Sequence, residues 1–303
     1  MKTFRDVSGI LLFDKPPGLS SNQALQKVRR LFEARKAGHT GSLDPLATGL
    51  LPICFGEATK IAGYLLGSHK AYAAECRLGV TTTTDDAEGD VLATRPVPVL
   101  SDAEMEAALA TLRGRIVQIP PVYAAIKQDG VALYKRARRG EDVQVPSREV
   151  EVDRLDLVAH EGAILHLHVE CGSGTYVRSL ARDLGERLGC GAHLTALRRL
   201  WVDPFRAPQM HPLAQLEQIG DASGVAGLDA LLLPLEQGLS GLPALHVGED
   251  EVLRLRQGKR LSQTLLVGQP LCRALDASGR LIALVEIDPN GEVTVRRGFN
   301  SPA

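Results

Sequence analysis

Apolar and polar positions near the start of the chain change from a strand-like run to a helical repeat. The continuous apolar run 9–13 (G-I-L-L-F) predicts a buried strand. The segment 14–18 (D-K-P-P-G) has the residues of a turn, and Ser20 or Ser21 is placed to cap the helix that follows. The apolar face of this helix consists of Leu25, Val28 and either Leu31 or Phe32.

Further along the chain, strand and helix patterns follow one another. In order, they predict a short helix near 57–66, a strand over 70–78, a polar loop over 81–90, paired strands over 148–158 and 163–171, and a helix over about 175–188. Ser101 and Glu104 form a capping box for a further helix that ends near Leu112. Gly189 is well suited to end the helix over 175–188.

The pattern changes from about Leu242 onward. Short alternating segments such as 281–287 and 293–297 are separated by turn dipeptides such as Asn290-Gly291. These segments predict a small all-β domain with its boundary near residue 240. The length of 303 residues fits this division into two domains, or one large domain with an appendage.

Composition excludes a disordered chain, because 44% hydrophobic and 23% charged residues are ordinary globular values. The formal net charge of −1 predicts no polyanion partner, so any nucleic-acid site must be a local basic patch. The densest cluster is 134–140 (Y-K-R-A-R-R-G). Smaller clusters are Arg198-Arg199, Arg254, Arg256, Lys259, Arg260 and Arg296-Arg297. We interpret them as phosphate contacts, the alternative being solvated helix faces.

The five cysteines are scattered and none lies in a C-x-x-C pair, which predicts reduced thiols in the cytoplasm. Residues 1–9 have no apolar signal core, and no apolar run reaches the roughly 20 residues that a membrane helix needs. His166 and His168 share one face of a predicted strand, which we expect to be exposed, without an Asp, Glu or Cys at a ligand spacing. We therefore predict no metal site and no membrane span.

The loop over 38–49 (G-H-T-G-S-L-D-P-L-A-T-G) contains the strongest candidates for chemistry. Its three glycines and one proline indicate a backbone in conformations that other residues resist. Asp44 can be a nucleophile, a general base or an N-cap, although Asp before Pro is also a common turn former. His39 can contact substrate or donate a proton, or it can simply bond the backbone of the loop.

Three more residues have a functional and a structural interpretation. Arg178 follows G-S-G-T-Y-V at a predicted helix start, where an arginine can keep a carboxylate ionised in a dry pocket or can face solvent. Tyr72 and Tyr176 can stack on a ring or pack in the core. The residue pattern alone leaves these alternatives open.

The segment 38–52 (G-H-T-G-S-L-D-P-L-A-T-G-L-L-P) resembles the active-site motif of the TruB-type tRNA pseudouridine synthases. Four more blocks agree with this family in order. They are D-K-P-P-G-L-S-S at 14–21, Q-I-P-P-V-Y-A-A-I-K at 118–127, G-T-Y-V-R-S-L-A-R-D-L-G at 174–185 and G-A-H-L-T-A-L-R-R-L at 191–200. The resemblance covers about residues 8–202, and the first motif is long and specific.

The resemblance implies a mixed α/β fold with a long, mainly antiparallel sheet. Residues 1–240 would be the catalytic domain, with an RNA-clamping insertion at about 118–148, and 241–303 a small β-rich, PUA-like RNA-binding domain. The family isomerises a uridine at position 55 in the T arm of tRNA, which must be flipped into a pocket. The reaction is redox-neutral, so the resemblance implies no metal and no cofactor, with tRNA as the partner and no obligatory protein partner.

The same resemblance assigns roles residue by residue. Asp44 corresponds to the essential aspartate, which attacks C1′ or deprotonates C2′, and Arg178 to the arginine that pairs with it. Tyr72 corresponds to the tyrosine that stacks on the flipped base and assists in moving the C5 proton. The other matching positions are His39 (displacement of the base), Tyr176 and Leu197 (uracil pocket), Lys15 and Pro16 (support of the loop), and Lys135, Arg136 and Arg138 (tRNA clamp). Ala124 departs from the family, which has a small hydroxyl residue there.

Three alternatives remain at this point. A guide-dependent relative would need protein partners and a guide RNA to choose the uridine. An RNA-folding chaperone would use the same surface without chemistry, although Asp44, Tyr72 and Arg178 together argue against it. A small-molecule hydrolase would need a second acid or base beside Asp44, and the sequence reveals none.

Overall fold

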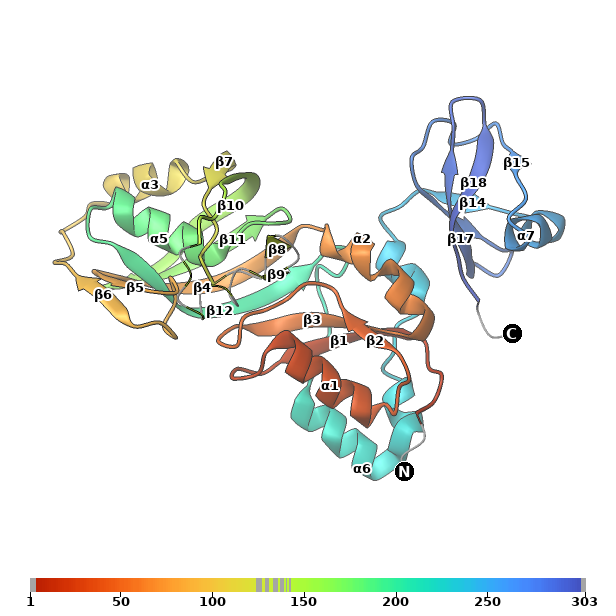
Figure 1. Cartoon of the computed structure of the whole chain (residues 1–303), viewed down its shortest axis with the longest axis horizontal. Coiled ribbons are helices and arrows are strands. Elements are labelled where there is room, and N and C mark those ends of the chain that lie inside the picture. Colours follow the sequence, from red (N-terminus) through yellow and green to blue (C-terminus); the bar gives the residue numbers. More distant parts are fainter. Residues whose placement is uncertain are drawn as a thin grey trace.

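The computed structural model describes residues 4–123, 127–128, 131–132, 136, 139, 141 and 143–300. Its main feature is a nine-stranded sheet (Figure 1). In spatial order the sheet contains β13 (His211–Pro212), β1 (Gly9–Lys15), β3 (Thr48–Phe55), β12 (Ala192–Val202), β4 (Lys70–Leu78), β11 (Ile164–Cys171), β10 (Arg148–Glu161) and β7 (Gly114–Gln118), while β2 (Ala37–His39) pairs with β3. Only the pairs β1–β13 and β3–β12 of this sheet are parallel, so the predicted long, mainly antiparallel sheet is confirmed.

Helices and short strands join these strands. The helical segments are α1 (Ser21–Leu31), η1 (Gly56–Ile61), α2 (Ala62–Leu66), α3 (Asp102–Ala110), α5 (Val177–Arg187), α6 (Leu213–Asp229), η2 (Leu235–Leu239) and α7 (Glu249–Arg256). The short strands are β5 (Val80–Thr82), β6 (Val91–Thr94), β8 (Lys127–Gln128) and β9 (Val131–Ala132). The predicted capping box of Ser101 with Glu104 is present, and Ser20, one of the two predicted caps, forms a second box with Gln23. Each box satisfies backbone N–H groups that the first helical turn leaves without partners.

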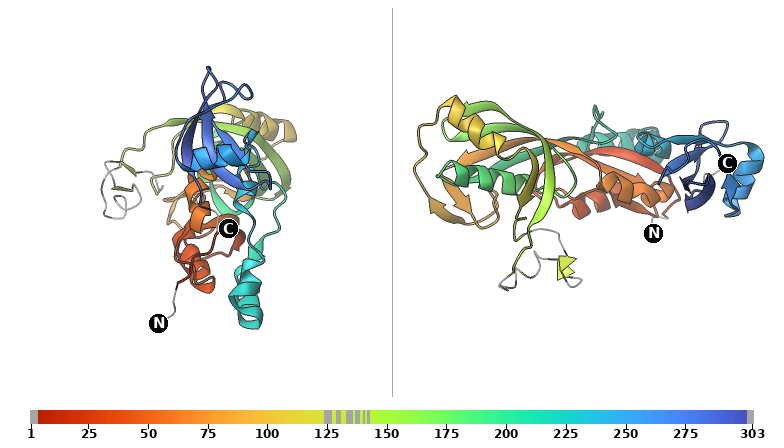
Figure 2. Two further views of the ribbon diagram at one scale, coloured as in Figure 1. Left: turned by 90° about the vertical axis from the view of Figure 1, so that its right-hand side faces the viewer. Right: turned by 90° about the horizontal axis from the view of Figure 1, so that it is seen from above.

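The C-terminal part forms a second sheet at one end of the molecule's long axis (Figure 2). Its strands, in spatial order, are β14 (Ala244–His246), β16 (Cys272–Leu275), β17 (Leu281–Ile287), β18 (Glu292–Gly298) and β15 (Leu261–Ser262). One face buries its own apolar cluster, which includes Val285 and Val293. Leu284 and Phe299 belong instead to a cluster shared with Leu50 of the large sheet, so the two sheets are packed together.

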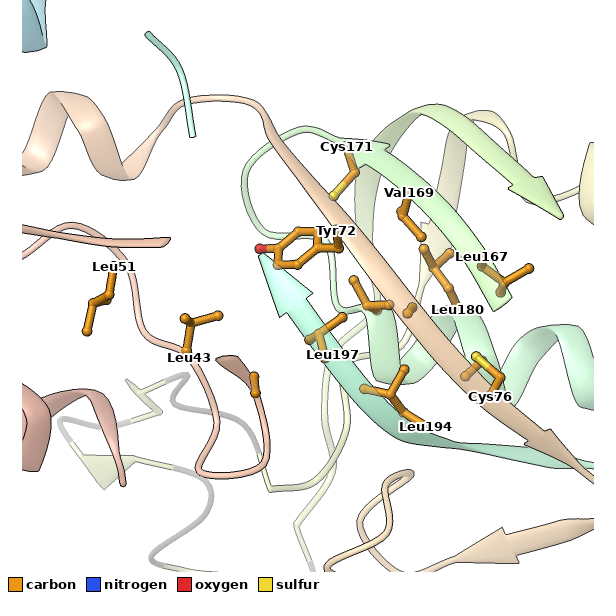
Figure 3. Packing of buried hydrophobic residues seen from close by; sticks show 14 of the residues in the cluster. Leu43, Leu51, Tyr72, Cys76, Leu167, Val169, Cys171, Leu180, Leu194 and Leu197 are labelled. Atoms are coloured by element: carbon orange, nitrogen blue, oxygen red, sulfur yellow. The ribbon is translucent and has the colours of Figure 1, made fainter. Parts of the chain in front are cut away.

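One part of the main core lies where α5 packs against the middle of the large sheet (Figure 3). Leu180 of α5 meets Val169 of β11 and Cys76 of β4, and all three side chains are buried. Complete burial of one such aliphatic side chain contributes about 2 kcal/mol to folding. This packing fixes the start of α5 beside β4 and β12, which is where the functional residues gather.

Several sequence expectations need correction. Asp14 and Lys15 belong to β1 and not to a turn, and the polar loop expected over 81–90 has Thr82 in β5 and Asp86 buried. The sequence interpretation also contained no strand for β12 and no helices for α6 and α7. The apolar residues of β12, α6 and α7 contact several different elements, so their spacing along the sequence does not show a single helix or strand period. Within the described part of the chain, no helix is long and apolar enough to cross a membrane.

Candidate active site

A cleft of about 350 Å³ opens where four parts of the chain meet: the loop before β3, the strand β4, the segment leading into α5, and β12. This volume lies within the range of about 300–1,000 Å³ that small-molecule sites occupy. Asp44, Tyr72, Tyr176, Arg178 and Leu197 all line it. The structure therefore brings together five of the residues that the sequence proposed for the site.

The loop that carries Asp44 is held from behind by β1 and α1. Lys15 is fully buried, and its ammonium donates to the carbonyl oxygens of Pro16 at 2.8 Å and Pro45 at 3.3 Å. The Ser21 hydroxyl exchanges two hydrogen bonds with the backbone of Leu43, at 2.7 and 3.0 Å. The expected contact of Lys15 with the loop is confirmed, and burial lowers the pKa of Lys15 to about 8.

Asp44 contacts Arg178, whose Nε lies 3.1 Å from the Asp44 Oδ2. The Arg178 side chain is 5% exposed, while that of Asp44 is 42% exposed because it faces the cleft. Water thus reaches the carboxylate from one side only, and desolvation by the surrounding protein raises its pKa. Arg178 opposes this rise and Asp86 adds to it. The predicted pairing of Asp44 with Arg178 is confirmed, whereas its role in catalysis stays a prediction.

Arg178 is itself held by a second carboxylate, Asp86, which the sequence interpretation missed. The Nη1 of Arg178 lies 3.2 Å from Asp86 Oδ2 and donates to the Thr84 carbonyl at 3.1 Å. The Nη2 of Arg178 donates to the Tyr123 carbonyl at 3.3 Å. The Asp86 side chain is 3% exposed and also accepts from the backbone N–H of Glu88 at 3.0 Å. The density of hydroxyl and acidic residues in T-T-T-T-D-D-A-E-G-D at 81–90 was the available signal, but it also fits a solvated loop.

Tyr72 and Arg199 lie directly opposite each other on β4 and β12 and line the same cleft. Both are buried, with exposures of 8% and 1%. The expectation that Arg198-Arg199 contact phosphate is therefore wrong for Arg199, which points inward. Arg198 points to the opposite face of β12 and forms an ion pair with Asp14 at 2.7 Å.

Tyr176 and Leu197 form other parts of the cleft wall. The Tyr176 backbone exchanges two hydrogen bonds with the buried Gln118 side chain, at 2.8 and 3.1 Å, immediately before α5 begins. The Arg148 guanidinium lies 5.5 Å from the centre of the Tyr176 ring. Leu197 is 9% exposed and its backbone lies in β12 beside β4. These contacts hold one wall of the cleft against α5 and the other against the sheet.

Other proposed residues lie elsewhere. His39 belongs to β2 and does not line the cleft, and burial together with Arg199 lowers its pKa, so its ring is neutral at pH 7. Arg136 is 2.7 Å from Glu141 in an ion pair. Lys135 and Arg138, like Ala124, lie outside the described residues.

The residues described by the structure include no group of three or more His, Cys, Asp or Glu side chains placed to hold a metal ion. His166 and His168 do share one face of β11, but they are partly buried and not exposed. Glu170, two residues further along this strand, lies 3.0 Å from His168 Nε2. A carboxylate therefore lies beside His168 without forming such a group.

Comparisons with known proteins found similar sequences. A family model described as the TruB family pseudouridylate synthase N-terminal domain matches residues 29–177, and one described as the tRNA pseudouridylate synthase B C-terminal domain matches residues 178–240. The chain is 54% identical to the tRNA pseudouridine synthase B of Xanthomonas axonopodis pv. citri (strain 306), over 98% of this chain and 96% of that protein. It is 55% identical to the protein of the same name from Xylella fastidiosa (strain Temecula1 / ATCC 700964), over 98% of both chains.

Solved structures with the same fold include a chain of a Cbf5-Nop10-Gar1 complex, with a TM-score of 0.76 and 23% identity over 99% of this chain and 86% of that one. A chain of an H/ACA RNP bound to a substrate RNA containing 2′-deoxyuridine has a TM-score of 0.75 and 21% identity, over 97% of this chain and 85% of that one. At this identity the likeness concerns the fold alone.

Proposed function

The chain belongs to the TruB family of pseudouridylate synthases, and on this premise we propose that Asp44 acts on one uridine in the T arm of tRNA. The enzyme isomerises uridine to pseudouridine in tRNA. One observation carries the assignment of Asp44: its carboxylate lies 3.1 Å from the buried Arg178 inside a cleft that Tyr72 also lines. The proposed target is the uridine at position 55, as the resemblance of the motif at 38–52 implies.

The chemistry requires an ionised Asp44. Pseudouridine formation breaks the bond between N1 and C1′ and joins C5 to C1′, without net oxidation or reduction. Asp44 either attacks C1′ or removes a proton from C2′, and a protonated carboxyl can do neither. Burial in the cleft favours the neutral form, and the positive charge of Arg178 offsets this. Arg178 is thus proposed to keep the carboxylate available at neutral pH.

The substrate must enter the cleft as a flipped nucleotide, because the target atoms are hidden in a stacked arm. Tyr72, Tyr176 and Leu197 are proposed to surround the base, and their positions on the cleft wall support this. His39 is proposed to assist in displacing the base, and Lys15 to brace the catalytic loop. Lys135, Arg136 and Arg138 are proposed to clamp the RNA within an insertion at about 118–148.

We propose a domain boundary near residue 240, with the C-terminal sheet acting as a PUA-like RNA-binding domain. The separate apolar cluster of that sheet supports the division. We propose that the enzyme works in the cytoplasm, a reducing compartment, and its five free cysteines agree with this. No obligatory protein partner is proposed, since relatives that match nearly the whole chain are named as tRNA enzymes.

A T-arm stem-loop RNA tests the proposal, with pseudouridine mapped by carbodiimide modification and primer extension. We expect the wild-type chain alone to modify one uridine, and both Asp44→Ala and Asp44→Asn to bind the RNA without forming pseudouridine. Asp6→Asn is the matched control, because Asp6 is exposed and pairs only with Arg35 in the described part of the chain. Substantial turnover by either Asp44 variant would refute the assignment, and a need for added guide RNA would favour the guide-dependent alternative.

A further inference from the structure

Arg199 is a buried guanidinium without a carboxylate partner among the described residues. Its side chain is 1% exposed, yet the ion pairs of this part of the structure do not include it. An unpaired charge in the interior is costly, and proteins keep one where its field or its hydrogen bonds are used. The burial alone gives no function, so the direction of its donors matters.

Arg199 lines the cleft, and two of its donors are held by backbone carbonyls. Its Nε donates to the Leu50 carbonyl at 2.6 Å and its Nη2 to the Gly41 carbonyl at 3.2 Å. The guanidinium and the Tyr72 phenol lie on directly opposite residues of β12 and β4 and interact electrostatically. Two backbone carbonyls therefore fix the guanidinium in place opposite the phenol.

Tyr72 faces three other groups that can carry charge. Asp44 lies across the cleft, Cys171 lies on the neighbouring strand β11 (Figure 3), and Lys70 lines the cleft from β4 itself. Burial raises the pKa of the Tyr72 phenol and Asp44 adds to this rise, while Arg199 opposes it most strongly. Burial also raises the pKa of Cys171 to about 11, so this thiol stays neutral. Arg199 lies directly opposite Tyr72 on the neighbouring strand, and its positive charge favours the phenolate.

We propose that Arg199 is a positioning residue that aims the Tyr72 oxygen at C5 of the flipped base and favours the phenolate that removes the C5 proton. This inference rests on the proposed function. After C5 has joined C1′, C5 holds both the sugar and its original hydrogen. The phenol first releases its proton to water in the open cleft, and the phenolate oxygen then takes the hydrogen of C5 as a proton. The electron pair of the C5–H bond becomes the C5=C6 double bond, and the N1=C6 pair returns to N1, which takes a proton from water.

Single-turnover kinetics on T-arm RNA test this role, with the target uridine carrying either hydrogen or deuterium at C5. We expect Arg199→Gln to lower the rate at least about tenfold with RNA affinity unchanged, because proton transfer by Tyr72 becomes slower. The ratio of hydrogen to deuterium rates should rise above that of the wild type. Arg199→Lys keeps a positive charge, so its rate and its isotope ratio should lie between those of the wild type and Arg199→Gln.

Arg206→Gln is the control, because Arg206 lies just after β12, pairs with Asp203 and does not line the cleft. It should keep the wild-type rate and isotope ratio. A lower rate of Arg199→Gln with an unchanged isotope ratio would mean that Arg199 only supports the structure, and an unchanged rate would exclude any role. If Arg199→Gln does not fold, Arg199→Lys decides alone, since an isotope ratio equal to that of the wild type overturns the proposal. Failure of the wild-type chain to modify the RNA would instead refute the proposed function.

Discussion

The carboxylate of Asp86 should be as necessary for the arrangement of the site as Asp44 is for its chemistry. Arg178 lies between the two carboxylates, with 3.1 Å from its Nε to Asp44 and 3.2 Å from its Nη1 to Asp86. Asp86→Asn removes the buried charge while keeping the size of the side chain. The amide oxygen can still accept from the Glu88 N–H, which now bonds to Asp86 Oδ1 at 3.0 Å.

The structure indicates how large the effect should be. Breaking a buried ion pair by removing one partner typically costs 3–5 kcal/mol. The amide oxygen of Asn at position 86 still accepts from the Glu88 N–H. We therefore expect a cost at the lower end of this range, a decrease of about 3 kcal/mol in the free energy of unfolding. For a protein of this size that corresponds to roughly 6–12 °C in Tm, taking about 2–4 °C for each kcal/mol.

Activity should fall as well, because Arg178 would keep only the Thr84 and Tyr123 carbonyls as partners on that side. We expect the single-turnover rate at pH 7.5 to fall at least about tenfold. The acid limb of the pH–rate profile should nevertheless move to lower pH. Asp86 raises the pKa of Asp44, so removing its charge lets Asp44 ionise in more acidic solution.

Urea unfolding, thermal unfolding and single-turnover rates from pH 5 to 9 measure these effects. Asp153→Asn serves as the control, because Asp153 pairs with His69 and is 38% exposed. This control should change the unfolding free energy by less than about 1 kcal/mol. An Asp86→Asn protein as stable as this control, or an acid limb displaced to higher pH, would refute the reasoning about the two carboxylates.

Three further predictions follow from the same site. Arg178→Gln removes the strongest influence that lowers the pKa of Asp44, so the acid limb of its pH–rate profile should move to higher pH; a shift to lower pH would contradict this. Asp44→Asn should unfold at a higher temperature than the wild type at pH 7, because ionising a carboxyl whose folded pKa is raised costs stability. That gain should disappear below pH 3.8, the ordinary pKa of Asp, where both states are protonated, and a lower Tm at pH 7 would exclude the explanation. Gly49→Ala should destabilise the fold by several kcal/mol in urea unfolding, since φ is +94° and the new Cβ would lie 2.2 Å from the Arg199 carbonyl oxygen; Gly18→Ala, with φ +78° and open space, should cost much less.

Sequence patterns within a few residues predicted the helices and strands whose side chains alternate regularly between buried and exposed positions or whose ends have a cap. The strand over 70–78 alternates between the two faces of the sheet, and the helix after Ser20 begins at a capping box formed within four residues. These signals are local because backbone hydrogen bonds and side-chain alternation involve near neighbours. α6 and α7 were missed, and α6 has a kink at Gly224 that interrupts its period.

The residues of the candidate site also divide into those that the sequence identifies and those that only the structure identifies. Asp44, Arg178 and Tyr72 could be named from motifs, because the resemblance supplies their roles and not only their positions. Asp86 could not be separated from an ordinary polar loop, and Arg199 looked like half of a basic surface pair. Both assignments depend on burial, which the order of residues does not record.

The sequence by itself therefore determined several strands, the helix caps, the family and the aspartate at the centre of the proposed chemistry. Only the tertiary structure decided which charged groups surround that aspartate. It also decided that Asp86 holds Arg178 and that Arg199 faces Tyr72 from the neighbouring strand. The physical reason is that hydrogen-bond periodicity is a property of neighbouring residues. Desolvation and charge pairing depend on distances between segments that meet only after folding.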